Sequence, residues 1–200
     1  MIICINLHDF KSFCTLLTKD NIFISHEMKP KLIVILQNLR SLHNVGSIFR
    51  TSDAAGVEKI YLVGTTPTPL DRFGRAREQF SKVSLGAERS LKWEKADSLS
   101  KLAKELKKDG WTVVAVEQHK DSRPYNKLLK SKSKKVAIIL GNEPKGLTAS
   151  ELKVADEILE IPMSGAMVRQ AHHPRRSGRG KESLDVSVAA GIVLFQLRYN

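Results

Sequence analysis

The sequence predicts an α/β protein in which a parallel β-sheet carries helices on both faces. Two short apolar runs, residues 32–37 (LIVILQ) and 136–140 (VAIIL), are nearly continuous, as in strands that are buried on both sides. Such runs alternate with helical patterns and turn residues through most of the chain. Two hundred residues with a hydrophobic content of 42% suffice for one domain with its own core.

The first predicted strand, residues 32–37, is followed by a helix predicted over residues 45–55. Asn44 is suited to cap the start of this helix because a short polar side chain can accept a backbone N–H there. Gly56 stands where a glycine commonly ends a helix. The next strand is predicted over residues 59–64 (KIYLVG).

Residues 65–79 are rich in turn formers and in arginine, which predicts either a long functional loop or a mobile one. An amphipathic helix, SLSKLAKELKK, follows, with Asp97 as its predicted N-cap and Gly110 at its end. The apolar stripe of this helix consists of Leu99, Leu102, Ala103 and Leu106.

Further strands are predicted over residues 111–116, 136–140 and 157–162, and they continue the alternation. The final helix, about residues 184–198, is apolar on nearly all sides. A terminal helix without a polar face must be covered on two sides, so we expect it to contribute to a subunit interface as well as to the core. The sequence therefore predicts a homodimer.

The charge balance favours a polyanionic partner. Lysine and arginine outnumber aspartate and glutamate by 33 to 21, which gives a net charge of +12. Nucleic acid is the usual partner of such a chain, and a merely basic soluble protein is the alternative. Cys4 and Cys14 lack the spacing of metal ligands, so neither a metal site nor a disulfide framework is expected. Because no apolar run suits a membrane span or a secretory signal, we expect a cytoplasmic protein.

Two segments carry residues that suit a chemical role. Residues 44–50 (NVGSIFR) place Asn44 and Arg50 on one predicted helix, where by themselves they are a helix cap and a solvated arginine. Residues 141–146 (GNEPKG) form a glycine-rich loop after a buried strand, which alone is typical of an ordinary turn.

A third segment is split by a basic tract. Its first half is IPMSG at residues 161–165, and its second half is KESLDVSVAAGI at residues 181–192. Removing the intervening residues 166–180 joins a strand end and a tight turn to the apolar final helix.

In this order, the three segments resemble the three signatures of the SpoU/TrmH family of RNA ribose 2′-O-methyltransferases, in the SPOUT superfamily. The resemblance covers about residues 31–198. It implies an α/β trefoil knot built on the parallel sheet, a homodimer, S-adenosylmethionine as cofactor, and a ribose 2′-hydroxyl of tRNA or rRNA as the methyl acceptor. Periodicity does not indicate a knot, and the general rules of chain topology argue against one.

By this resemblance, the catalytic residues are Asn44, Arg50, Glu143, Ser183 and Asp185. Arg50 matches the residue that activates the ribose hydroxyl. Because arginine almost never loses its proton, we interpret it as a phosphate clamp that also stabilises the developing alkoxide. Glu143 is expected to pair with Arg50 or to brace its loop, and Ser183 is also a candidate N-cap. Asp185 stands where the family usually has asparagine, and its carboxylate could pair with Arg50.

The same resemblance assigns the cofactor to Gly141, Ile161 and Leu184. The backbone of the loop at Gly141 would hold the cofactor, and the other two residues would flank it. Two rival functions remain at this stage. One is a catalytically impaired RNA-binding relative, because Asp185 and the basic tract both affect this pocket. The other is a dinucleotide-dependent oxidoreductase, but the early GxGxxG fingerprint of that class is missing from this sequence.

The predicted organisation is an N-terminal extension at residues 1–27 and a methyltransferase domain at residues 28–200. Met28 directly precedes the resemblance and is an alternative start, so the extension is a candidate non-native segment. The insertion at residues 166–180 is interpreted as a mobile excursion, either a basic arm for RNA or an acquired segment never shaped for binding. Its adjacent histidines, His172 and His173, lack further ligands at metal-binding spacing.

Overall fold

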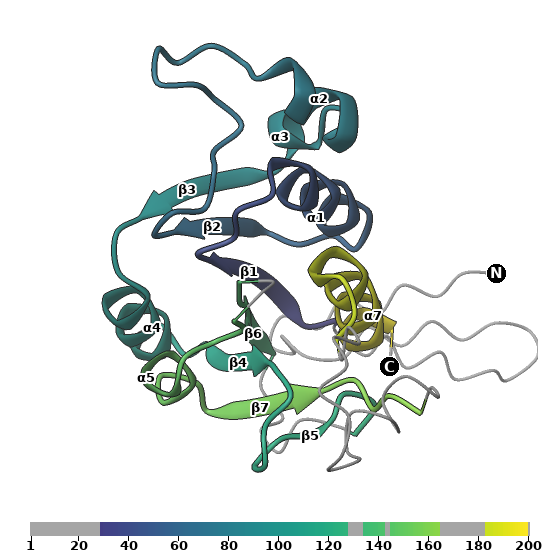
Figure 1. Ribbon diagram of the computed structural model, residues 1–200. Helices are drawn as coiled ribbons and strands as arrows, with labels where there is room; N and C mark the ends of the chain where they lie inside the picture. The colour runs from purple at the N-terminus through teal and green to yellow at the C-terminus, as the bar shows by residue number, and fades with distance from the viewer. Residues whose placement is uncertain (1–28, 128–133, 143–144, 165–182, 200) are drawn as a thin grey trace, which may run out of the picture.

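The computed structural model describes residues 29–127, 134–142, 145–164 and 183–199. Within these ranges seven strands form one sheet in the order β3-β2-β1-β6-β4-β7-β5, and every neighbouring pair is parallel (Figure 1). The strands are β1 (Lys31–Gln37), β2 (Lys59–Val63), β3 (Lys92–Ala96), β4 (Thr112–Val116), β5 (Arg123–Pro124), β6 (Lys135–Leu140) and β7 (Glu157–Glu160). The helices are α1 (Leu42–Ala54), α2 (Glu78–Ser84), α3 (Ala87–Ser90), α4 (Leu99–Lys108), α5 (Ala149–Leu152) and α7 (Val186–Tyr199).

Helices cover both faces of the sheet, as the sequence predicts (Figure 1). Successive side chains of a strand point to opposite faces, so the central strands β1 and β6 divide their apolar residues between two cores. Leu32, Val34 and Ile138 pack toward α1 and α7. Ile33 and Ile139 pack toward α4 and α5. The nearly continuous apolar runs of these strands follow from this double burial.

Two predicted helix caps are wrong. The N-cap of α1 is Ser41, whose hydroxyl accepts the backbone N–H of Asn44 at 3.2 Å, so Asn44 lies inside the helix. The N-cap of α4 is Ser98, which accepts from Lys101 N, and not the preceding Asp97. In both cases a serine within three residues of the predicted cap accepts a backbone N–H of the first turn instead. The predicted helix ends are confirmed, since Gly56 and Gly110 adopt φ values of 68° and 81°.

The sequence analysis did not predict the strands β3 and β5 or the short helices α2, α3 and α5. Strand β3 is the edge strand beside β2 and is only partly buried. Its sequence, KWEKA, therefore lacks the apolar run that marks a central strand. The loop expected at residues 65–79 ends earlier, because α2 begins at Glu78.

The fold places the last helix beside the first. α7 packs on α1, and buries Val186, Ala190, Val193 and Leu194. No helix in the described part of the chain is long and apolar enough to cross a membrane. The implied knot depends on the path from β7 to α7, and residues 165–182 on that path lie outside the described residues, so the knot stays a prediction.

Candidate functional site

A cavity of about 270 Å³ lies at the carboxyl ends of β4, β6 and β7. Gly141 directly follows β6, Ile161 directly follows β7, and Leu184 precedes α7; all three line this cavity. The carboxyl ends of parallel strands meet at one edge of a sheet, where α/β proteins bind their ligands. The structure therefore brings together the three residues that the sequence analysis assigns to the cofactor. We call this space the carboxyl-end cavity.

Two polar residues of this cavity were missed by the sequence analysis. Glu117 follows β4, and its carboxylate accepts the backbone N–H of Leu147 at 2.8 Å. Asn142 donates its side-chain amide to the carbonyl of Asn38 at 2.7 Å. The other amide atom, Asn142 Oδ1, is buried without a partner among the described residues. A buried acceptor of this kind costs free energy unless a ligand donor satisfies it.

The loop after β6 is built around close backbone contacts. A Cβ added to Gly141 would stand 2.7 Å from Cγ of Leu147 and 3.0 Å from the carbonyl carbon of Gly146. Gly146 adopts a φ of 63°, and a Cβ there would meet the carboxylate of Glu117. The loop is therefore folded tightly against itself, and a side chain at Gly141 would collide with both Leu147 and the backbone of Gly146.

These features fit S-adenosylmethionine. Leu140, Ile161, Leu184 and other apolar groups provide a wall suited to a purine ring, since ligand pockets are mostly apolar with a few placed polar groups. The unsatisfied Oδ1 of Asn142 and the carboxylate of Glu117 suit the amino groups of such a ligand. Glu143, the other carboxylate predicted in this loop, lies outside the described residues.

The start of α7 brings Asn44 and Asp185 together. The side-chain amide of Asn44 donates to Asp185 Oδ2 at 3.1 Å. The other oxygen of Asp185 accepts the backbone N–H and the hydroxyl of Ser187, at 2.8 and 2.6 Å. Partial burial raises the pKa of Asp185, but these hydrogen bonds outweigh that effect, and the pKa is lower than usual. Asp185 is thus ionised at neutral pH.

The predicted N-cap role of Ser183 is wrong. Helix α7 begins at Val186, and the carbonyl of Asp185 accepts the N–H of Ala189 at 3.0 Å. Asp185 therefore occupies the cap position, and its short carboxylate serves the first turn. Ser183 is exposed and lines the carboxyl-end cavity.

Arg50 does not line the carboxyl-end cavity. It lines an open groove of about 570 Å³, between α1, α2 and α7, together with His43, Ser47, Lys82 and Phe195. We call this the Arg50 groove. No residue of the described chain lines both this groove and the carboxyl-end cavity. Within one chain, Arg50 does not form the ion pair with Asp185 that the sequence analysis raised. The carboxylate of Asp185 accepts hydrogen bonds from Asn44 and Ser187.

The fold and the site define an α/β protein that binds a ligand at the carboxyl edge of a parallel sheet. The particular family follows from sequence: the model of the SpoU rRNA Methylase family matches residues 31–168, and the chain belongs to this family. The dinucleotide-dependent alternative is thereby removed.

Named relatives resemble the chain over most of its length. It is 30% identical to a tRNA (guanosine(18)-2'-O)-methyltransferase of Thermus thermophilus over 171 residues, which cover 84% of this chain and 74% of the relative. It is 28% identical to the 23S rRNA (guanosine-2'-O-)-methyltransferase RlmB of Neisseria meningitidis, over 85% of this chain and 59% of the relative. The chain thus spans less than two thirds of the second relative.

Solved structures share the fold. An AdoMet-bound rRNA methyltransferase from Sinorhizobium meliloti matches with a TM-score of 0.67 at 28% identity, over 86% of this chain and 57% of that one. The TrmH/SpoU tRNA modifying enzyme of A. aeolicus matches with a TM-score of 0.66 at 26% identity, over 85% of this chain and 75% of that one.

Proposed function

We propose that this protein transfers a methyl group from S-adenosylmethionine to a ribose 2′-hydroxyl of tRNA or rRNA, in the cytoplasm. The observation that carries the proposal is the carboxyl-end cavity, where Gly141, Ile161 and Leu184 meet from three separate segments. The named relatives are 2'-O-methyltransferases of tRNA and rRNA, and one matching structure holds AdoMet. These comparisons give no support to a catalytically impaired relative.

The chain's own residues supply positioning and charge. When bound, S-adenosylmethionine would supply an electrophilic methyl group: the ribose oxygen, as it loses its proton, would attack the methyl carbon in line, and the C–S bond would break with the thioether as leaving group. Ile161 and Leu184 would hold the apolar part of the cofactor, and Asn142 would accept a hydrogen bond from it. Arg50 stays protonated, so it holds an RNA phosphate and stabilises negative charge that develops on the ribose oxygen. Asn44 is a positioning residue that fixes Asp185 at the start of α7.

A second copy of the chain would complete this site. Ala189 lines the carboxyl-end cavity and Phe195 lines the Arg50 groove, so six residues of α7, about 9 Å along its axis, separate the two spaces. Within one chain, Arg50 therefore lines a different space from the one assigned to the cofactor. We propose a two-fold homodimer in which the Arg50 groove of one subunit lies against the carboxyl-end cavity of its partner.

The exposed face of α7 supports this dimer. Val188, Phe195 and Tyr199 are 50%, 41% and 62% exposed, and the rings of Phe195 and Tyr199 stack with their centroids 5.8 Å apart. An apolar face of this kind marks an interface.

We expect Phe195→Glu to convert the dimer into a monomer in light scattering, because burying an unpaired carboxylate is costly. As a control, Leu85→Glu, on an equally apolar exposed residue of the α2–α3 turn, should leave the mass unchanged; a monomeric parent protein would contradict the proposal.

We also propose that residues 28–200 form the methyltransferase domain and that residues 166–180 are an insertion dispensable for its folding. Loop-closure free energy grows slowly with length, so an insertion of this size costs only on the order of 1–3 kcal/mol. Deleting residues 166–180 should leave a folded protein that binds S-adenosylmethionine at least as tightly as the parent, measured by calorimetry. A tenfold loss of RNA affinity with unchanged cofactor binding would identify the tract as an RNA arm instead.

The proposed function is tested by methyl incorporation. The purified protein is incubated with methyl-labelled S-adenosylmethionine and with separate tRNA and rRNA fractions from a strain lacking this protein. Labelling of either fraction, with the modified nucleotide mapped to a ribose 2′-oxygen, is the expected result. Binding of the cofactor and RNA without transfer to either fraction would favour the RNA-binding alternative.

A further inference from the structure

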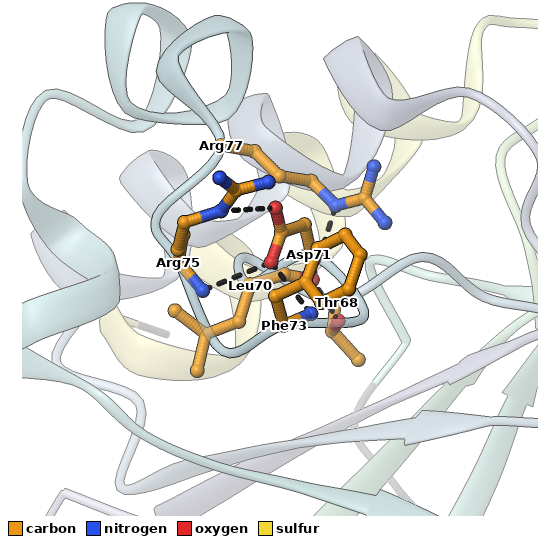
Figure 2. Close-up of polar contacts among 6 residues, drawn as sticks. All are labelled: Thr68, Leu70, Asp71, Phe73, Arg75 and Arg77. Atoms are coloured by element: carbon orange, nitrogen blue, oxygen red, sulfur yellow. Dashed lines mark hydrogen bonds and ion pairs between the residues drawn. The ribbon is translucent and has the colours of Figure 1, made fainter.

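A compact hairpin of residues 68–77 projects from the fold between β2 and α2 (Figures 1 and 2). We call it the arginine hairpin, because it carries Arg72, Arg75 and Arg77. An antiparallel bridge joins Leu70 to Ala76 across its base. Arg77 also donates from Nε to the carbonyl of Leu70 at 3.1 Å. The segment is therefore held by its own contacts, as compact functional loops often are.

Asp71 fixes the tip of the arginine hairpin (Figure 2). Its Oδ1 accepts the backbone N–H groups of Phe73 and Arg75 at 2.8 and 2.9 Å, and its Oδ2 accepts Nε of Arg75 at 3.0 Å. The hydrogen bond from the Arg75 backbone is the main cause of a lowered pKa for Asp71, so the carboxylate is ionised at neutral pH. Gly74 supplies the φ of 76° that the turn requires.

The hairpin tip that Asp71 fixes presents the aromatic ring of Phe73 to solvent. Phe73 is 64% exposed, although a phenylalanine is normally buried. The guanidinium carbons of Arg72 and Arg75 lie 4.7 and 4.9 Å from the centre of its ring. Arg75 is tied to Asp71, whereas Arg72 forms no ion pair among the described residues. Arg72 is thus free to leave the ring for a phosphate, while Arg75 stays in place.

We propose that Phe73 is a stacking platform for one unpaired base of the substrate RNA, with Arg72 and Arg75 on the flanking phosphates. The inference deepens the proposed function, on which it rests. An exposed ring with guanidinium groups beside it is the chemistry that recognises an unstacked base and its backbone. A continuous duplex offers no free base face, so the substrate class is an RNA loop, bulge or single strand.

The position of the hairpin suits this role. It leads directly into α2, whose Lys82 lines the Arg50 groove. An RNA strand whose phosphate is held at Arg50 therefore meets basic residues on both of these neighbouring segments. An acidic peptide would also be attracted to the arginines, but it has no flat ring to cover Phe73. Charge and aromatic exposure together favour RNA.

The test compares binding of two RNA probes, an RNA stem-loop and a fully paired duplex of equal length, without cofactor. Phe73→Ala and Phe73→Leu should both weaken stem-loop binding roughly 5- to 100-fold and leave duplex binding nearly unchanged. Phe73→Trp should retain the parent affinity because it keeps a ring. The hairpin survives these changes, since Asp71 bonds to the backbone N–H of residue 73. Leu85→Ala, which removes an apolar side chain that is also 64% exposed, is the matched control.

A base analogue whose fluorescence reports stacking, placed in the loop of the probe, should respond to the parent protein and not to Phe73→Ala. Equal loss for the stem-loop and the duplex, or parent affinity in Phe73→Leu, would overturn the proposal. Polyglutamate that binds as tightly as the stem-loop, and loses affinity in the Phe73 variants, would also overturn the proposal. A Phe73-dependent stem-loop complex with no methyl transfer would uphold this inference and contradict the proposed function instead.

Discussion

Replacing Arg50 with alanine is expected to lower the rate of methyl transfer by a factor of about 100–1,000, as does the loss of one donor to a developing oxyanion. S-Adenosylmethionine should bind this variant almost as it binds the parent, because Arg50 lines its own groove and shares no cavity with Gly141, Ile161 or Leu184. Single-turnover transfer to the labelled RNA fraction, together with calorimetry of the cofactor, measures the two effects separately.

Two further variants show which property of Arg50 matters. Arg50→Lys keeps the positive charge but loses the planar fork of donors, so we expect an intermediate rate. Lys104→Ala removes an exposed cation from α4, on the opposite face of the sheet, and should transfer methyl at the parent rate. A parent rate in Arg50→Ala would show that the catalytic assignment is wrong.

The same variant tests whether the site is shared between subunits. A heterodimer of one Arg50→Ala subunit and one Gly141→Ala subunit, isolated with two different tags, contains one intact pairing only if Arg50 acts on its partner's cavity. At an S-adenosylmethionine concentration that saturates the parent but not Gly141→Ala, such a dimer should have about half the parent activity, because two-fold symmetry gives two equivalent sites. If Arg50 serves the cavity of its own chain, both sites are defective at that concentration and the heterodimer has little activity.

The meeting of Gly141, Ile161 and Leu184 at one cavity could be predicted from the sequence because strand order and family signatures constrain it strongly. Gly141 and Ile161 each follow a strand that the apolar pattern identifies, and parallel strands bring such positions to one edge. Leu184 joins them although the basic tract separates it from Ile161 in sequence. Extra residues between two elements lengthen the chain without requiring the elements to pack differently, because the cost of loop closure grows slowly with length.

The remaining features depend on contacts between segments that no local pattern encodes. Glu117 and Asn142 have a role only through Leu147 N and the carbonyl of Asn38. Ser41 and Asn44 are equally good helix caps by residue type. In the structure Ser41 is the cap, and the side chain of Asn44 forms a hydrogen bond with Asp185 instead. The separation of Arg50 from the cavity follows from the packing of α7 on α1, which sequence spacing does not show.

Replacing Gly141 with alanine is expected to reduce the affinity for S-adenosylmethionine by about 10- to 100-fold, equivalent to about 1.4–2.8 kcal/mol. The added methyl would stand 2.7 Å from Cγ of Leu147, which is buried, and 3.0 Å from the carbonyl carbon of Gly146. Neither neighbour can swing into solvent, so the loop of residues 141–147 must shift. Overpacking of this kind typically costs 1–3 kcal/mol, and the shift moves backbone that lines the carboxyl-end cavity.

Calorimetry of the cofactor and thermal unfolding should be measured on the same protein. Gly191→Ala is the matched control, because its added methyl would lie 3.6 Å from Thr51 Cγ2, an ordinary contact. It should leave cofactor affinity unchanged. Adding Leu147→Ala to the Gly141→Ala variant removes the nearest obstructing atoms, so the double variant should bind the cofactor more tightly than Gly141→Ala alone, despite the stability lost from the core. Equal affinities in the single and double variants would show that contact with Leu147 is not what weakens cofactor binding in Gly141→Ala.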